Sequence, residues 1–178
     1  MENKYWKNFY KKKEITSKPS SFAKWIKELK TSKKIYDIGC GNGRDSKYFI
    51  KKGFDVVSVD LNSDYGIKKS VIKFVNSKLE EGTFYSRFFL HSISNEDILN
   101  FIEKIPSGSY FVAEYRVKGD EPVIYKEHKR NFINQEWLLL NLIMNNYRIE
   151  YSIVSNGLAK YKKEDPLIGR VIAHKYGE

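Results

Sequence analysis

The chain has 178 residues, enough for one domain with a full core and too few for a separate substrate domain. Its net charge of +10 comes from lysines spread along the whole chain, which are expected mainly to cover the surface, although a basic field also attracts polyanions. The single cysteine excludes a disulfide framework, and nothing indicates a metal site. No apolar run approaches the roughly 18 residues that span a bilayer, and the N-terminus carries no apolar signal segment. We therefore expect a soluble, cytoplasmic protein.

Residues 1–30 are predicted to form an aromatic segment followed by a helix. Trp6 and Tyr10 belong to a group of aromatic residues that precedes a lysine run. In residues 22–29 the apolar side chains recur every three or four positions, which is the period of a helix. This helix is expected to lie against the sheet of the core, residues 34–178.

Residues 35–60 are predicted to form a strand, a glycine-rich turn, a helix and a second strand that ends on Asp60. The turn has glycine at every second position, and glycine can adopt a positive φ and has no Cβ, so the backbone can pass directly under a ligand. A carboxylate at the end of the second strand can accept both hydroxyl groups of a ribose. The stretch therefore predicts a nucleoside site. Its glycines are Gly39, Gly41 and Gly43.

The glycine spacing distinguishes between kinds of nucleoside. A dinucleotide fingerprint requires a small residue where this chain has Arg44. Residues 37–45 instead resemble motif I of the class I S-adenosylmethionine (SAM) methyltransferases; the run is Asp-Ile-Gly-Cys-Gly-Asn-Gly-Arg-Asp. In that family the glycine loop cradles the methionine part of the cofactor. The acid matching Asp60 holds the ribose, and the acid matching Asp37 helps to hold the loop and the amino group.

The resemblance implies SAM as the cofactor and a single methyltransferase domain over residues 1–178. The implied fold is α/β and Rossmann-like, a doubly wound, mostly parallel seven-stranded sheet with an antiparallel last strand and helices on both faces. Residues 71–75 are predicted as its third strand, after a turn or two of helix in 63–70. Relatives carry an acid that contacts adenine after this strand, where this chain has Asn76 and Ser77. The predicted cofactor-binding residues are Asp37, Gly39, Cys40, Gly41, Gly43, Arg44, Asp60, Leu61, Asn76, Ser77 and Ser86.

The aromatic segment at the N-terminus acquires a role through the same resemblance. In the family, a segment of this kind folds over the cofactor and helps to form the acceptor pocket. Aromatic faces could attract the cofactor's sulfonium at about 0.5–2 kcal/mol per contact. Trp6 and Tyr10 are the predicted lid and substrate-binding residues, with ordinary packing of a leading helix as the alternative.

The remaining elements follow the order of the family. A fourth strand and its exit loop are predicted at 84–93, a helix at 95–104 and a fifth strand from 109 to 113. A helix at 135–145 is predicted to bury a stripe made of Trp137, Leu138, Leu142 and Ile143. Two last strands, near 148–155 and 168–176, would complete the sheet, with the seventh strand inserted between the fifth and sixth.

Charged side chains gather just beyond the predicted fourth and fifth strands, where ligands sit in doubly wound sheets. Arginine forks bind carboxylate or phosphate oxygens in bidentate fashion, so three of them predict an anionic acceptor. A hydroxyl acceptor must also lose a proton, and a histidine with a pKa near 6.5 suits that task. We hypothesise that His128, or failing that His91, is the general base. The predicted substrate-binding residues here are Arg87, Glu114, Arg116 and Arg130.

The loop at 86–89 lacks the Asn or Asp, prolines and aromatic that are typical of enzymes methylating adenine amino groups. Enzymes that methylate a carbon of cytosine need a nucleophilic cysteine, and Cys40, which lies inside the glycine turn, is in the wrong place for that role. The sequence therefore favours O-methylation of a small polar, anionic metabolite such as a sugar phosphate or nucleotide sugar. Two alternatives stay open: an RNA methyltransferase, indicated by the basic charge, and a non-catalytic SAM-binding subunit of a complex.

Overall fold

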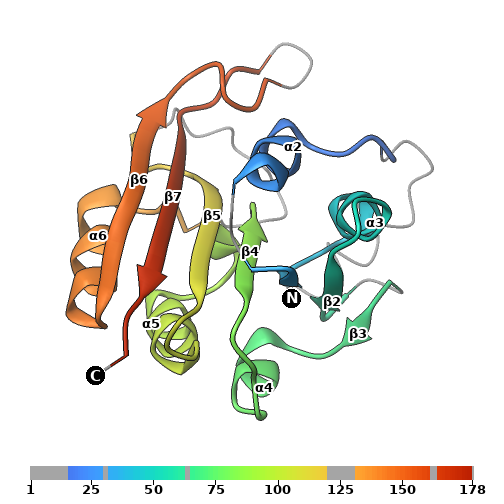
Figure 1. Ribbon diagram of the computed structural model, residues 1–178. Helices are drawn as coiled ribbons and strands as arrows, with labels where there is room; N and C mark the ends of the chain where they lie inside the picture. Colours follow the sequence, from blue (N-terminus) through green and yellow to red (C-terminus); the bar gives the residue numbers. More distant parts are fainter. Residues whose placement is uncertain (1–15, 30–31, 63–64, 120–130, 161–163, 178) are drawn as a thin grey trace.

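The computed structural model describes residues 16–29, 32–62, 65–119, 131–160 and 164–177 (Figure 1). Its centre is a seven-stranded sheet with the order β3-β2-β1-β4-β5-β7-β6. The strands are β1 (Lys34–Ile38), β2 (Asp55–Asp60), β3 (Ile67–Lys68), β4 (Thr83–Arg87), β5 (Tyr110–Arg116), β6 (Tyr147–Ser155) and β7 (Ile168–Lys175). The helices are α2 (Ser21–Glu28), α3 (Arg44–Lys51), α4 (Val71–Val75), α5 (Asn95–Lys104) and α6 (Gln135–Met144), with a short 3₁₀ turn, η1 (Leu90–Ser92).

The strands from β3 to β5 run parallel, whereas β7 runs antiparallel to both of its neighbours, β5 and β6. This arrangement confirms the predicted fold, including the insertion of the seventh strand between the fifth and sixth. The parallel strands all end at one edge of the sheet, called here the carboxyl edge. None of the helices in the described part of the chain is both long and apolar enough to cross a membrane.

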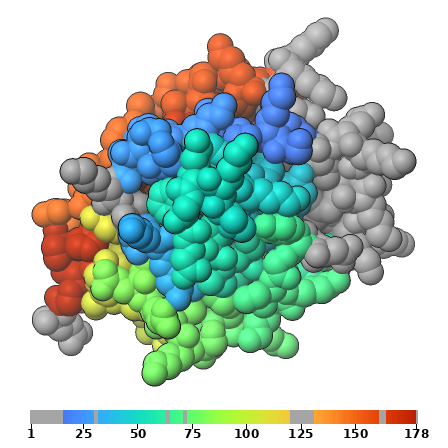
Figure 2. All heavy atoms as spheres, turned by 45° about the vertical axis from the view of Figure 1, so that its right-hand side comes forward, coloured from blue at the N-terminus to red at the C-terminus, as the bar shows by residue number. Residues whose placement is uncertain are grey.

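Helices cover both faces of the sheet. Successive side chains of a strand point to opposite faces, so each strand contributes to two hydrophobic cores. In β4, for example, Phe84 belongs to the core under α4, α5 and α6, while Tyr85 belongs to the core under α2 and α3. Figure 1 shows α2 and α3 together on one side and α5 and α6 on the other, and Figure 2 shows α2 and α3 packed side by side. Both cores exclude water from the strands that carry the site.

Three predictions about elements were wrong. Residues 71–75 form helix α4 rather than the third strand. The third strand is the two-residue β3 at the lateral edge of the sheet, and it lies within residues 63–70, where a turn or two of helix was predicted. A five-residue apolar run is compatible with either element; here it packs under the sheet, with the Phe74 ring 5.9 Å from the ring of Tyr36. In α6, Leu138 and Leu142 are buried as predicted, but Ile143 is 56% exposed because it faces away from the sheet.

A buried carboxylate ties α2 to α3 and β4. Asp45, in the first turn of α3, accepts hydrogen bonds from the backbone N–H and hydroxyl of Ser20 at 2.7 and 2.8 Å. It also accepts one from the Tyr85 hydroxyl at 2.8 Å. Ser20 in turn caps α2 by accepting from the N–H of Ala23 at 2.9 Å. The start of α2 is therefore fixed at the carboxyl edge.

We expect Asp45→Ala to lower the free energy of unfolding by about 2–4 kcal/mol, because it leaves buried donors of Ser20 and Tyr85 without their charged acceptor. Urea denaturation followed by circular dichroism measures the change. Glu96→Ala is a matched control, since Glu96 is an exposed acid in the first turn of α5 and should cost under about 0.5 kcal/mol. Equal losses in the two variants would contradict the role given to Asp45.

Candidate functional site

The glycine turn, residues 39–43, joins β1 to α3 at the carboxyl edge. Gly39 and Gly43 have φ values of 73° and 71°, a left-handed conformation that side chains rarely adopt. A Cβ at Gly39 would lie 2.5 Å from the Phe89 ring, and one at Gly43 would lie 2.1 Å from the Tyr65 ring. The backbone N–H groups of Gly39 and Cys40 both donate to the carbonyl of Val59, at 2.8 and 3.1 Å. The turn is thus fastened to the end of β2.

Asp60, the last residue of β2, completes this fastening. Its buried carboxylate accepts from the Gly41 N–H at 3.0 Å and from the Asn62 N–H at 2.7 Å. Leu61 follows it and is largely exposed. Asp60 and Leu61 therefore lie beside the glycine turn, as a ribose-binding acid and its neighbour require, and their roles as cofactor ligands stay predictions.

Asp37 lies in β1 just before the turn and is buried. The Ser46 hydroxyl donates to it at 2.5 Å, and the Ser58 hydroxyl donates to that of Ser46 at 2.8 Å. Burial, assisted by the charges of Asp45 and Asp60, raises the pKa of Asp37 to about 7, although the hydrogen bonds from Ser46 act in the opposite direction. The turn is therefore surrounded by carboxylates, whose negative potential suits a cationic ligand.

Cys40, inside the turn, is not a nucleophile. Burial raises the pKa of its thiol, and so do the charges of Asp37 and Asp60. The thiol donates to the carbonyl of Tyr65 at 3.7 Å. A protonated, buried thiol packs as a small apolar group. Among the described residues no group of three or more His, Cys, Asp or Glu side chains is arranged to hold a metal ion.

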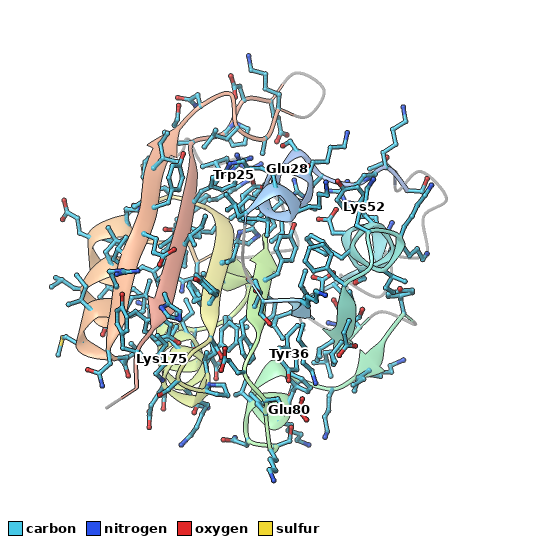
Figure 3. All side chains as sticks on the ribbon, viewed as in Figure 1. Trp25, Glu28, Tyr36, Lys52, Glu80 and Lys175 are labelled. Carbon is cyan, nitrogen blue, oxygen red and sulfur yellow. The ribbon has the colours of Figure 1, made fainter. Side chains whose placement is uncertain are left out.

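Ser86 and the pair Asn76 and Ser77 were predicted together, but the structure separates them. Ser86 pairs with Ile38, next to the turn, and its fully buried hydroxyl has no hydrogen-bond partner within the described ranges. Asn76 and Ser77 follow α4 instead of a strand, so the reason for assigning them to the cofactor no longer holds. After Ser77 the chain returns to the N-terminal ends of the parallel strands. Figure 3 shows Glu80 below Tyr36 there, and the Tyr36 hydroxyl accepts a hydrogen bond from the Glu80 N–H at 3.2 Å.

The predicted arginine cluster is already paired with acids. Arg87 donates through Nε to Glu114 at 2.8 Å, and Arg116 donates to Glu164 at 3.1 Å. Glu114 is fully buried and also accepts from Arg170, through Nε at 2.8 Å. Glu114 therefore holds two arginines and is not available to a substrate. Arg87 and Arg116 each have an acid partner, and their role in binding an anionic group of the substrate stays a prediction.

His91 lies in η1 and is buried, with its ring 5.8 Å from that of Phe88. Phe88 has a φ of 55°, unusual for a side chain of its size, and its N–H donates to the Glu114 carbonyl at 2.8 Å. This sharp bend carries Phe89 onto Gly39. Four further predicted residues lie outside the described residues: Trp6, Tyr10, His128 and Arg130.

Sequence reasoning missed Arg170 and Tyr65. Arg170 stands in the strand Ile-Gly-Arg-Val-Ile-Ala, and an arginine among buried apolar residues implies a buried acid as partner. Tyr65 follows β2 in a polar stretch and carries no comparable signal. A surface hollow of about 490 Å³ against Asn146, Arg148 and Tyr176 contains none of the residues of the site.

The sheet order, the glycine turn and the acid that closes it define a class I SAM-dependent methyltransferase. The sequence model of the family described as "Tellurite resistance protein TehB" matches residues 2–98. The chain belongs to this family. None of the curated protein sequences compared with the chain matches it.

Solved structures agree with the fold. A SAM-dependent methyltransferase from Archaeoglobus fulgidus is 19% identical, with a TM-score of 0.66 over 85% of this chain and 90% of that one. TehB from Haemophilus influenzae is 16% identical, with a TM-score of 0.66 over 98% of this chain and 67% of that one. The 1,6-didemethyltoxoflavin-N1-methyltransferase from Burkholderia thailandensis, with bound 1,6-didemethyltoxoflavin and S-adenosylhomocysteine, is 15% identical, with a TM-score of 0.63 over 81% of this chain and 71% of that one.

The pKa of Asp37 predicts how stability depends on pH. An unfolded Asp titrates near 3.9, so between about pH 4 and pH 7 the folded chain binds the additional proton. The contribution of Asp37 to the free energy of unfolding therefore falls as the pH rises through this window, by at most about 4 kcal/mol, and is constant above it. Asp37→Asn cannot ionise and should gain stability relative to the wild type as the pH rises.

Urea denaturation of both proteins from about pH 5 to pH 8 measures this difference. Asp55→Asn serves as the control, because Asp55 is exposed at the other end of the neighbouring strand. Parallel profiles for Asp37→Asn and the wild type would show that Asp37 is ionised throughout.

Glu114→Gln should destabilise the fold by about 3–5 kcal/mol, because the substitution leaves Arg87 and Arg170 partly buried beside a neutral group. Glu150→Gln removes an exposed ion pair with Arg148 and should cost under about 1 kcal/mol. Chemical denaturation of the two variants compares them directly. A loss below about 1 kcal/mol in Glu114→Gln would mean that the two arginines do not depend on this carboxylate.

Proposed function

We propose that this chain transfers the methyl group of SAM to a small polar, anionic acceptor bound at the carboxyl edge beside β4 and β5. The observation that carries the proposal is the fastening of the glycine turn to Asp60, since it presents bare backbone next to a buried carboxylate. When bound, the cofactor would supply a methyl group already activated by the sulfonium charge. The chain's own task is then to position the two reactants, which contributes about 7–11 kcal/mol in favourable cases.

The residues around the turn fit the cofactor part by part. Asp60 would accept the ribose hydroxyls, and the backbone of residues 39–43 would lie under the methionine part. Asp37 would face the amino group, a cation that also favours the ionised carboxylate. The Ser86 hydroxyl, buried and without a partner in the part of the chain that the structure describes, would gain one from the ligand.

The proposal of an anionic acceptor has two supports. Arg87 and Arg116 line the ends of β4 and β5, and each still carries positive charge at this edge although each has an acid partner. The family is described by resistance to tellurite, which is a small inorganic oxyanion. An O-methyl acceptor would need a base, for which His128 is the first candidate and the buried His91 the second.

Asp60→Ala should weaken the binding of S-adenosylhomocysteine about 10- to 100-fold, because hydrogen bonds to a charged group contribute about 1.5–3 kcal/mol each. Isothermal titration calorimetry measures the affinity. Asp55→Ala is the matched control from the same strand and should bind within about two-fold of the wild type. Failure of the wild type to bind would overturn the proposed function.

A transfer assay with methyl-labelled SAM tests the acceptor class. Tellurite and sugar phosphates represent small anions, and RNA represents the alternative favoured by the basic charge. Label in a small anion supports the proposal. Label in RNA, lost steeply as salt rises, would replace it by the RNA methyltransferase reading. Binding of the cofactor without transfer to any of these acceptors would favour a non-catalytic subunit.

A further inference from the structure

Three charged residues form a row across the sheet at the carboxyl edge, on the face covered by α2 and α3. Arg87, Glu114 and Arg170 are direct neighbours on β4, β5 and β7. The charged row contains two cations and one anion, so it carries one positive charge in excess. The fully buried Glu114 is shared between the two arginines and cannot neutralise both.

The two arginines of the charged row differ in how many of their guanidinium nitrogens have an acceptor. Arg170 donates to Glu114 through Nε, and its Nη2 lies 2.7 Å from the same carboxylate oxygen and donates to the Leu158 carbonyl at 3.1 Å. The Arg170 guanidinium lies 5.1 Å from the ring centre of Phe22 and 5.6 Å from that of Trp25, which Figure 3 shows beside α2 at the upper end of the sheet. Arg170 is therefore bound through Nε and Nη2, and its guanidinium packs against α2.

Arg87 is only half used. Its Nε donates to Glu114, and its guanidinium lies 4.3 Å from the ring centre of Phe88. Its terminal nitrogens have no hydrogen-bond acceptor among the described residues. The side chain is nevertheless only 19% exposed. The excess charge of the row is therefore concentrated on the outer end of Arg87.

A second under-used arginine lies beside it. Arg44 is the first residue of α3, directly after the glycine turn, and its side chain is 20% exposed. Its Nε is 3.8 Å from Asp45, too far for a hydrogen bond, because Asp45 is engaged by Ser20 and Tyr85. The Tyr85 hydroxyl donates to Asp45, the residue that follows Arg44. Because Tyr85 and Arg87 are two positions apart on β4 and share a face, this bond places Arg44 near Arg87. Burial lowers the pKa of Arg44, and the positive charge of Arg87 lowers it further.

We propose that Arg44 and Arg87 together bind a carboxylate or a comparable oxyanion at the carboxyl edge, next to the glycine turn. Two partly buried cations repel one another, and an anion between them would relieve the repulsion and accept their unused N–H groups. The inference rests on the proposed function, because it assigns the anion to one of the two reactants.

Charge complementarity favours the cofactor as the source of this anion. The amino-acid end of SAM is a zwitterion, and the site separates its charges in the same way. Carboxylates of Asp37 and Asp60 lie on the β1 and β2 side of the turn, and the two guanidiniums lie on the α3 and β4 side. An anionic group of the acceptor is the other source with the same chemistry.

Arg44→Gln is the decisive variant. The ion pair of Arg44 with Asp45 is long, at 3.8 Å, so its loss should leave the fold intact, as a melting curve will verify. Calorimetry compares S-adenosylhomocysteine with 5′-methylthioadenosine, which lacks the amino-acid end. We expect Arg44→Gln to weaken the first about 10-fold or more and to leave the second unchanged. Arg87→Lys, which keeps the charge but loses the fork, should show a smaller effect of the same kind. Arg148→Gln, an exposed arginine distant from the turn, is the control.

The second arm of the experiment uses tellurite and inorganic phosphate as probes, with and without S-adenosylhomocysteine, and reads the melting temperature. Stabilisation of the wild type by an oxyanion that Arg44→Gln abolishes, with cofactor affinity unchanged, assigns the pair to the acceptor. If Arg44→Gln matches Arg148→Gln in both arms, the pair binds no anion and the inference is wrong. Absence of S-adenosylhomocysteine binding to the wild type would refute the proposed function separately, and the oxyanion arm without cofactor would then decide the inference alone.

Discussion

The carboxyl edge depends on the attachment of the glycine turn to β2. Two N–H groups of the turn share the carbonyl of Val59, and the N–H of Gly41 reaches the Asp60 carboxylate. These bonds join the first and second strands of the parallel sheet at the place where the chain reverses into α3. The left-handed backbone of the turn costs little only because its residues are glycines, and in this conformation it leaves a surface of peptide groups between two buried acids.

Around this point, charge is distributed unevenly. Asp45 and Glu114 are buried acids that serve the fold. Asp45, in α3, accepts three hydrogen bonds from the cap of α2 and from β4, and Glu114 joins β4, β5 and β7. Asp37 and Asp60 leave a negative potential at the turn, and Arg44 and Arg87 leave a positive one beside it. A buried carboxylate that is fully hydrogen-bonded stabilises the fold. A partly buried charged group whose donors have no acceptor is instead stabilised by a ligand that supplies one.

The turn could be predicted from sequence because its conformation depends on local residues, and the order of the flanking strands followed from the same stretch. The third strand could not, since β3 has two residues at the edge and the apolar run after it suits a helix equally well. The pairing of Arg87 also escaped prediction. Its acid is shared with Arg170, which reaches Glu114 only through the antiparallel register of β7, a contact between residues far apart in sequence.

Two hydrogen bonds beside the turn define a fixed length of chain. The Asn42 side chain donates to the Thr16 carbonyl at 3.2 Å, and Asp45 accepts from Ser20, with Ser17, Lys18 and Pro19 between the two anchor points. This short segment has a fixed length, because one end is bound to the glycine turn and the other end is the cap of α2. Insertions or deletions within it would break one of the two anchors, whereas changes of length before Thr16 would leave both in place. We therefore expect related sequences to vary in length before Thr16 and to keep the same length between Thr16 and Ser20.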